Sequence, residues 1–371
     1  MADNKDKKVL NVPALRFPEF TEEWKKIRLG DNCNIQMCKR IMAAQTNTEG
    51  GVPFYKIGTI GGKADAYISK DLFDEYKRKY SYPNKGEVMI TCAGTVGKCV
   101  IYDGEDSYYQ DSNIVWIDNP NEIISNDFLY HLLSNINWSY LNSTTIVRIY
   151  NDDLRNLKLC CPRLDEQKKI ANFLSLIDER IAAQNKIIEK LETLIKGIIE
   201  TVISSQKPNT LIKNCLECNS STLQESQVAE TGTFPVYGAT GISGYTEAAD
   251  INGESILIIK DGSGVGTVKF VTGEYSYIGT LNSLSAKDGY CLKYIYIALQ
   301  RFNFEPYKTG MAIPHIYFKD YGKAKIFCPT IKEQFAIAKR ISSIEDKVSV
   351  EKRILFYYQA QKSYLLSQML I

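Results

Sequence analysis

The sequence predicts a mixed α/β (α+β) protein in which a globular domain followed by a long helix occurs twice in tandem. Three observations support this prediction: an internal repeat, two long segments with coiled-coil periodicity, and short β-branched runs within each globular part. On this basis the 371 residues divide into an N-terminal extension (1–15), a first domain (16–160), a central helix (161–205), a second domain (206–327) and a C-terminal helix (328–371).

The repeat has a constant spacing of 167 residues. Cys161-Pro162 matches Cys328-Pro329, and the Glu-Gln pair in "PRLDEQKKI" returns in "PTIKEQFAI". Upstream, "GEVMITCAG" matches "GESILIIKDG", and "IVRIYNDD" matches "IPHIYFKD". Because these matches follow one another in the same order, they indicate a duplicated domain rather than a chance likeness between two helices.

Each domain is expected to contain short strands, one short helix and an extended segment that leads into the long helix. Runs such as "SILIIK" and "TVKFV" are interrupted by Gly, Asn and Asp, as is typical of strands joined by turns. "DFLYHLLSN" and "LKYIYIALQR" are short and amphipathic. The Cys-Pro pair then marks the start of each long helix, because proline is tolerated just ahead of the first turn.

The two long helices carry a coiled-coil pattern. Apolar residues recur at alternating steps of 4 and 3 from Ile170 to Val202 and from Ile337 to Met369. We therefore predict that the helices pair as an antiparallel coiled coil with pseudo-two-fold symmetry. About 40 residues at ~1.5 Å each give a helix of roughly 60 Å. Lys362 and Tyr358 weaken the second pattern, so that end is expected to pack differently, for example against a partner.

A polar residue interrupts both patterns at the same place, Gln184 in the first helix and Glu351 in the second. If the helices pair antiparallel in full overlap, these two side chains meet. A buried polar pair costs stability but fixes the register of a coiled coil. We predict that Gln184 and Glu351 set the register; the alternative is that both face solvent at a widened seam.

Composition predicts a soluble, cytoplasmic protein. Hydrophobic residues make up 44% of the chain, the start "MADNKDKK" is too polar for a signal peptide, and no apolar run is long enough to span a membrane. The ten cysteines are expected to be free thiols, and the only C-x-x-C, Cys215 and Cys218, lacks the second pair that a zinc site needs, so no metal is expected. Two histidines leave little material for His-based acid–base chemistry.

The first domain holds 17 basic and 19 acidic residues and the second 11 of each, so any anion-binding face must come from uneven distribution or from a partner.

The N-terminal "LRFPEFTEEWKKIRLGD", the two Pro-x-x-x-Glu-Gln helix openings and the duplicated layout resemble the specificity (S) subunit of type I restriction-modification enzymes. The resemblance covers nearly the whole chain. It implies that each globular part is a target recognition domain that reads one half of a bipartite, asymmetric site in double-stranded DNA. The helices would then set the spacing and dock two methyltransferase (modification) subunits, which two restriction (translocase/endonuclease) subunits join in systems that cleave. No cofactor is expected on this chain, whereas S-adenosylmethionine, ATP and Mg are implied for the partner subunits.

A specificity subunit should lack catalytic motifs, and we expect no catalytic residues. In and directly before "AGTVGKC", Cys92 stands where a P-loop needs Gly, and Cys99 stands where it needs Ser or Thr. "DGSGVGTVK" lacks the glycine spacing of a dinucleotide site. Asn119-Pro120 is not followed by the Pro-aromatic pair of an amino-methyltransferase. A fused methyltransferase-nuclease is therefore disfavoured, and the alternative function is a coiled-coil scaffold whose domains bind proteins.

The glycine-rich loops "GTVGK" and "DGSGVGTVK" have two interpretations. They bring backbone N–H groups, with Lys98 or Lys269, to DNA phosphates, or they are hairpins that need glycine for positive φ. Both interpretations stay open on the sequence alone.

Candidate DNA-contacting residues lie just before each long helix and in a few basic clusters. Arginine reads guanine, and threonine can bond a base or touch a thymine methyl group; the alternative is an ordinary surface turn. The "YKRKY" segment mixes cations with tyrosines and is a phosphate-contacting candidate, although a solvated helical face explains it too. The residues before the helices are Thr144, Thr145 and Arg148, and Thr309, Met311 and His315; the basic clusters give Lys77, Arg78, Lys79 and Tyr80, with Lys39, Arg40, Lys260 and Lys308 as further candidates.

Overall fold

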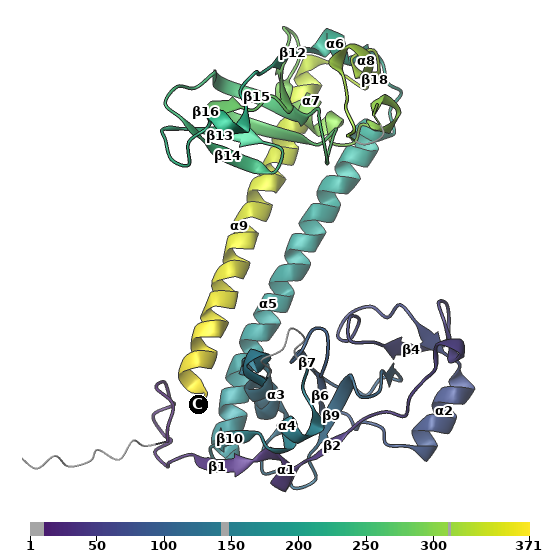
Figure 1. Ribbon diagram of the computed structural model, residues 1–371, viewed down its shortest axis with the longest axis vertical. Coiled ribbons are helices and arrows are strands. Elements are labelled where there is room, and N and C mark those ends of the chain that lie inside the picture. The colour runs from purple at the N-terminus through teal and green to yellow at the C-terminus, as the bar shows by residue number, and fades with distance from the viewer. Residues whose placement is uncertain (1–10, 142–147, 311–312) are drawn as a thin grey trace, which may run out of the picture. The chain divides into compact units, whose positions relative to one another are not determined.

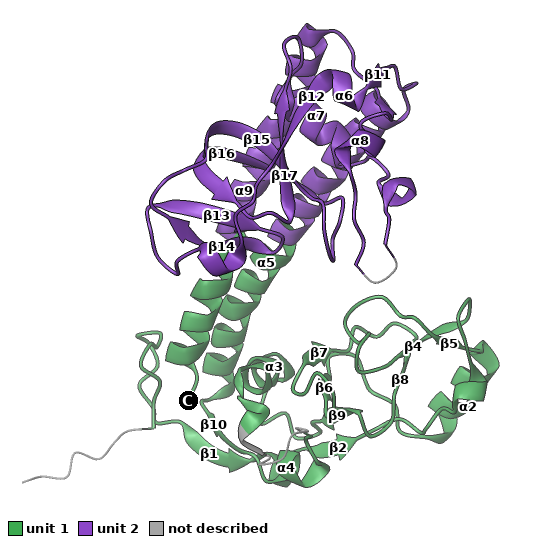
Figure 2. Ribbon diagram, turned by 45° about the horizontal axis from the view of Figure 1, so that its top comes forward, with its two compact units in different colours: residues 1–183, 355–371 green, residues 184–354 purple. Residues whose placement is uncertain are grey.

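The computed structural model describes residues 11–141, 148–310 and 313–371. The chain divides into two compact units: unit 1 comprises residues 1–183 and 355–371, and unit 2 comprises residues 184–354 (Figure 2). The two long helices are α5 (Leu164–Ile199) and α9 (Ile331–Met369) (Figure 1), and both contribute to both units (Figure 2). Each unit therefore combines one globular domain with parts of both long helices.

The main sheet of unit 1 is antiparallel, with the strand order β2-β9-β6-β7. Its central strands "VMIT" and "IVWID" are almost entirely buried, which β-branched and aromatic side chains favour. Helix α3 packs on β6 and β7 and shares their core. The bounds are β2 Asn34–Gln36, β6 Val88–Thr91, β7 Cys99–Ile101, β9 Ile114–Asp118 and α3 Asn126–Asn135.

A second, smaller sheet in unit 1 was not anticipated from the sequence. It has the order β3-β5-β4-β8, and helix α2 packs beside it around the buried Phe73 and Ile68. Three of its strands have only two residues, so their alternation is too short to read, and their partners are distant in the sequence. The bounds are β3 Thr46–Asn47, β4 Val52–Tyr55, β5 Tyr67–Ile68, β8 Tyr108–Tyr109 and α2 Lys70–Lys79.

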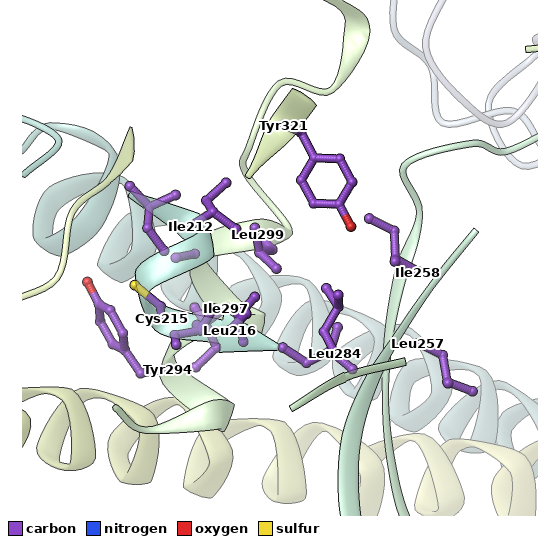
Figure 3. Packing of buried hydrophobic residues seen from close by; sticks show 14 of the residues in the cluster. Ile212, Cys215, Leu216, Leu257, Ile258, Leu284, Tyr294, Ile297, Leu299 and Tyr321 are labelled. Atoms are coloured by element: carbon purple, nitrogen blue, oxygen red, sulfur yellow. The ribbon is translucent and has the colours of Figure 1, made fainter. Parts of the chain in front are cut away.

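Unit 2 is built on one six-stranded sheet with the order β12-β17-β15-β16-β13-β14. Helix α7 packs on β15 and β16, and residues such as Leu284, Tyr294 and Ile297 fill the core beside helix α6 (Figure 3). The bounds are α6 Ile212–Cys215, β12 Leu216–Ser220, β13 Phe234–Gly238, β14 Gly241–Thr246, β15 Ile251–Ile259, β16 Val268–Tyr277, β17 Leu281–Ala286 and α7 Leu292–Leu299.

The same short ribbon precedes the long helix in each unit. In unit 1, β1 (Lys25–Arg28) pairs with β10 (Lys158–Cys161), and in unit 2, β11 (Thr210–Leu211) pairs with β18 (Lys325–Ile326), both antiparallel. The remaining helical segments are α1 Leu29–Asn32, α4 Asn151–Arg155 and α8 Phe318–Tyr321, the 3₁₀ turns Ala43–Gln45, Trp138–Leu141, Glu225–Gln227 and Glu305–Tyr307, and a π-turn at Glu200–Ser204. The duplication predicted from the sequence is thus visible in the secondary structure of both units.

The glutamine of each Pro-x-x-x-Glu-Gln motif ties the long helix to the domain. Gln167 is 1% exposed; its Oε1 accepts from Ser125 N (2.7 Å), and its Nε2 donates to the carbonyls of Pro162 (2.9 Å) and Ile123 (3.0 Å). Ser125 is the N-cap residue of α3, so one side chain joins the starts of two helices.

Gln334 repeats this arrangement in unit 2. It accepts from the backbone of Cys291, the N-cap of α7, at 3.0 Å and donates to the carbonyl of Pro329 at 2.9 Å. The glutamine of the motif is therefore a structural joint between the long helix and the domain in both units.

The glutamate of the motif differs between the units. In unit 1, Glu166 is buried and receives both the Arg16 guanidinium (2.6 and 2.7 Å) and Trp24 Nε1 (3.3 Å), which explains the N-terminal "LRFPEFTEEW". The hydrogen bonds from Arg16 to this carboxylate raise the pKa of the guanidinium. In unit 2, Glu333 is exposed and caps its own helix by accepting from Thr330.

The seam predicted on the long helices is present. Every predicted position from Ile170 to Val202 and from Ile337 to Met369 is buried or half-buried. In unit 2, Gln184 Nε2 lies 2.5 Å from Glu351 Oε2 and 3.1 Å from its carbonyl oxygen. Ile199, at the end of α5, lies fifteen residues after Gln184 and shares its core with Ile341, which precedes Glu351, so the segments run antiparallel. That the pair sets the register remains a prediction.

The interruption of the second seam at Lys362 is matched by a partner on the first helix. Within unit 1, Lys362 Nζ lies 2.5 Å from Asp178 Oδ1.

His131, close to this pair, is 1% exposed. Burial lowers the pKa of His131 to about 4, although the charge of Asp178 opposes that shift. Among the described residues its Nδ1 has no hydrogen-bond partner.

Candidate nucleic-acid interface

The glycine-rich loop of unit 1 is a hairpin between β6 and β7. Met89 pairs with Val100 and Ile90 with Cys99, and the connecting loop carries positive φ at Gly94 (65°) and Gly97 (83°). A residue with a Cβ is strained in this region, so the hairpin interpretation of "GTVGK" holds for its conformation.

The corresponding loop of unit 2 connects β15 and β16. Gly262, Gly264 and Gly266 have φ values of 92°, 85° and 91°. The loop of unit 2, residues 260–267, is one residue longer than the loop of unit 1, residues 92–98. In unit 2 the N–H groups of Gly262, Val265 and Gly266 already donate to backbone carbonyls, so contact of these loops with phosphate stays a prediction.

An aromatic side chain packs directly on each hairpin. A Cβ on Gly97 would lie 2.1 Å from the indole of Trp138, and a Cβ on Gly266 would lie 2.9 Å from Phe304. Beside each contact runs an open groove, of about 760 Å³ in unit 1 and about 510 Å³ in unit 2. The grooves lie at equivalent places, between the glycine hairpin and the chain that follows the short helix; polar lining residues are Ser134, Asn137 and Ser139 in unit 1 and Gln300, Asn303 and Lys308 in unit 2.

The segment before each long helix is fastened to its hairpin by a backbone hydrogen bond. Ile149 N donates to the carbonyl of Cys92 at 2.9 Å, and Ile316 N donates to the carbonyl of Lys260 at 2.9 Å. Both isoleucine side chains are buried. Arg148 and His315, which directly precede them, are therefore held at equivalent positions next to the glycine hairpins.

The two side chains have different surroundings. The Arg148 guanidinium lies 5.7 Å from the centre of the Tyr150 ring, which is 59% exposed. His315 Nδ1 lies 2.7 Å from Asp261 Oδ1, and its backbone bridges to Thr309. Thr144, Thr145 and Met311, predicted as neighbours, lie outside the described residues.

The lysines predicted beside the hairpins are engaged within their own units. Lys98 Nζ donates to the carbonyl of Ile60 at 2.5 Å, and Lys269 lies over the Tyr237 ring at 4.5 Å. Lys308 pairs with Glu305 at 2.5 Å, and Lys260 is half-buried. Contact of these residues with DNA stays a prediction.

The "YKRKY" cluster lies at the end of α2, and most of its charges have carboxylate partners. Lys77 pairs with Asp106 (3.0 Å) and Lys79 with Glu75 (2.7 Å), and hydrogen bonds from Lys70 and Lys77 hold the pKa of Asp106 below its ordinary value. These pairs are exposed and screened by solvent, so the cations can exchange their carboxylate partners for a phosphate. Arg78, in the same cluster, is exposed. Two further candidates lie outside the cluster: Lys39 Nζ lies 5.4 Å from the centre of the Tyr80 ring, and Arg40 pairs with Asp111 at 2.8 Å.

Sequence reasoning missed Asp261, Trp138 and Phe304. Asp261 stands directly before the glycines of "DGSGVG", and the two aromatic residues follow the short helices "DFLYHLLSN" and "LKYIYIALQ". The aromatic pair sits at nearly the same place in the two repeats and could have been found by extending the alignment; the contact between Asp261 and His315 joins residues 54 positions apart and leaves no local signal.

The described residues contain neither a metal-binding cluster nor a membrane-spanning helix. No group of three or more His, Cys, Asp or Glu side chains is arranged to hold a metal ion in the part of the chain that the structure describes. Cys215 lies next to Cys328, with their sulfurs 3.8 Å apart. Within residues 11–141, 148–310 and 313–371, no helix has the length and apolar character to cross a membrane.

The geometry therefore defines a class: two non-identical copies of one α/β domain, each with a grooved hairpin face and each joined to paired helices. The chain belongs to the family of the type I restriction modification DNA specificity domain, which matches residues 21–193 and 214–355. The match covers both domains and most of both helices.

Relatives of this family are similar to the chain in sequence and in fold. A putative type I restriction enzyme specificity subunit of Haemophilus influenzae is 47% identical over 189 residues, which are 51% of this chain and 46% of that relative, so this match spans less than half of the relative. Another, from Methanocaldococcus jannaschii, is 23% identical over 92% of both chains. The crystal structure of the type I S subunit from M. genitalium has a TM-score of 0.67 at 18% identity and covers 97% of this chain and 99% of that one, a likeness of fold.

Proposed function

We propose that the chain is the non-catalytic specificity subunit of a type I restriction-modification complex, in which each domain reads one half of a bipartite, asymmetric site in double-stranded DNA. Membership of the DNA specificity family supports this function. The observation that carries it is the pair Arg148 and His315: one duplicated scaffold holds two different polar side chains at equivalent positions. Two such domains suit two different half-sites.

The remaining predicted contacts sort by chemistry into phosphate-positioning and base-reading residues. The exposed cations of the α2 cluster suit phosphate, because their ion pairs with carboxylates are weak. Backbone N–H groups at the glycine hairpins suit the same role. Arg148, Thr309 and His315 suit base edges, since they stand on the segment that is fastened to each glycine hairpin.

The paired helices set the distance between the two domains and dock the methyltransferase subunits. Exposed aromatic residues on α9 support the docking role: Phe356, Tyr357 and Tyr364 are 65%, 66% and 61% exposed, which is costly unless a partner covers them. In this assembly S-adenosylmethionine, ATP and Mg belong to the methyltransferase and restriction subunits, and this chain supplies recognition only.

Mapping N6-methyladenine in cells that express the chain with its methyltransferase tests the function. The expected result is a split motif with one methylated adenine in each half. A continuous palindromic motif would contradict recognition by two different domains. If the chain fails to co-purify with a methyltransferase and no methylation depends on it, the protein-binding scaffold is the better description.

The balance of charge leads to a second measurement. Because both domains are close to neutral, the isolated chain should bind its site weakly at physiological salt, and the methyltransferase should add the basic surface that neutralises phosphates. Titration of one labelled duplex with the chain alone and with the complex compares the two affinities directly. Nanomolar binding by the isolated chain would contradict this reasoning.

A further inference from the structure

The imidazole of His315 is held in place and still reachable. Its Nδ1 lies 2.7 Å from Asp261 Oδ1, and the backbone of His315 is bridged to both Asp261 and Thr309. The side chains of His315 and Asp261 are 35% and 32% exposed. Gly310 closes one edge of the ring, since a Cβ there would lie 3.2 Å from His315 Cδ2.

The contact with Asp261 determines what the other ring nitrogen offers. A carboxylate only accepts hydrogen bonds. The Nδ1 of His315 therefore carries the proton and donates a hydrogen bond to Asp261 Oδ1. In the neutral ring, Nε2 is then a hydrogen-bond acceptor. No described residue donates to Nε2, which leaves this acceptor available to a ligand.

The equivalent position in the first domain offers the opposite chemistry. Arg148 carries donors only, and the residue that follows Cys92, as Asp261 follows Lys260, is Ala93, which has no polar group to orient a neighbour. In the major groove, guanine presents acceptors, whereas adenine N6 and cytosine N4 present donors. The two domains are thus equipped to select different bases at equivalent points.

We propose that His315 is a specificity-determining residue of the second domain, and that Asp261 is the positioning residue that makes its Nε2 an acceptor for the amino group of adenine or cytosine. The proposal rests on the function proposed above and adds the class of base that the second domain selects. Asp261 itself need not touch DNA.

Three variants of the full chain separate the reading atom from its support. His315→Asn keeps an amide nitrogen near the position of Nδ1, and with it the contact to Asp261, but has no atom at Nε2. His315→Gln instead reaches the position of Nε2. Asp261→Ala frees the ring to adopt either tautomer. Asp288→Ala, an exposed carboxylate in the same unit, is the matched control.

Each variant is co-expressed with the methyltransferase, and N6-methyladenine is mapped across the genome. His315→Asn and Asp261→Ala should relax one base-pair position in one half of the motif, with roughly 10-fold less discrimination, and leave the other half unchanged. His315→Gln, whose amide oxygen can accept at the position of Nε2, should keep the preference at that position, and Asp288→Ala should reproduce the wild-type motif. If His315→Asn lowers the melting temperature, the other two variants carry the test.

Two results would overturn the proposal: an unchanged motif in both His315→Asn and Asp261→Ala, or equal relaxation of both halves. Failure of the proposed function is distinguishable, because the wild-type chain would then give no bipartite motif at all.

Discussion

Replacing Gln167 with leucine tests whether the Glu-Gln motif joins the long helix to the first domain. The side chain is buried and makes three hydrogen bonds, to Ser125 N, Ile123 O and Pro162 O. Leucine has a similar volume but no polar atoms, so the change removes the bonds and leaves the packing largely intact. Gln334→Leu is the equivalent change in unit 2, where the side chain makes two such bonds.

The expected magnitude follows from the number of bonds. A typical hydrogen bond contributes about 1 kcal/mol net, so Gln167→Leu should cost about 3 kcal/mol and Gln334→Leu about 2 kcal/mol. For a unit of roughly 200 residues, 1 kcal/mol lowers the melting temperature by about 2–4 °C. The expected shifts are therefore about 6–12 °C for the transition of unit 1 and about 4–8 °C for that of unit 2.

Differential scanning calorimetry measures the shifts, and amide hydrogen exchange locates them. Exchange should quicken at the start of α3 in Gln167→Leu, because Ser125 N loses its acceptor, and at the start of α7 in Gln334→Leu. The control is Gln361→Leu, an exposed glutamine on α9. A shift in Gln361→Leu as large as in Gln167→Leu, or a larger loss in Gln334→Leu than in Gln167→Leu, would refute the reasoning.

Three further predictions rest on other parts of the fold. Changing both Gln184 and Glu351 to leucine should loosen the register of the helices and alter the oligomeric state or the cross-linking pattern of cysteine pairs placed along them; an unchanged pattern would contradict a role in register. The protein should lose about 3 kcal/mol of stability as the pH falls from about 6.5 to 4, because His131 is protonated in the unfolded chain before the native one, whose pKa is about 4; urea titrations of the wild type and His131→Met at both pH values measure this, and equal loss in both would count against it. Gly97→Ala should displace Trp138 and abolish recognition of one half-site only, which the methylation map would show as relaxation of that half; loss of both halves would contradict it.

The long helices were predictable because their periodicity is local and extends over many turns. The observed bounds, Leu164–Ile199 and Ile331–Met369, lie within the predicted 161–205 and 328–371, and the contact between Gln184 and Glu351 follows from the seam alone. Lys362 shows the limit of such reasoning. It breaks the apolar pattern, yet its partner Asp178 stands on the other helix, and a pattern read along one helix gives no information about that pairing.

The candidate site was predictable in location but not in detail. The repeat places Arg148 and His315 at matching positions, so the segment beside each hairpin could be identified from the sequence. The fate of individual lysines could not, because Lys98 turns to a carbonyl 38 residues away and Lys77 to Asp106. Such contacts depend on the tertiary structure, in particular on the small sheet of unit 1, whose two-residue strands carry no readable pattern.

The internal repeat provides a criterion that separates scaffold from recognition without any other sequence. Features that perform the same buried role in both units are structural: Gln167 with Gln334, and the anchoring isoleucines of the recognition segments. Recognition must instead differ between the units, because two identical domains would read identical half-sites. Arg148 and His315 meet that requirement, since the same anchor holds a donor in one unit and an acceptor in the other. A change at a shared buried position should therefore weaken one domain as a whole, whereas a change at Arg148 or His315 should alter which base is selected and leave the stability of the domain intact.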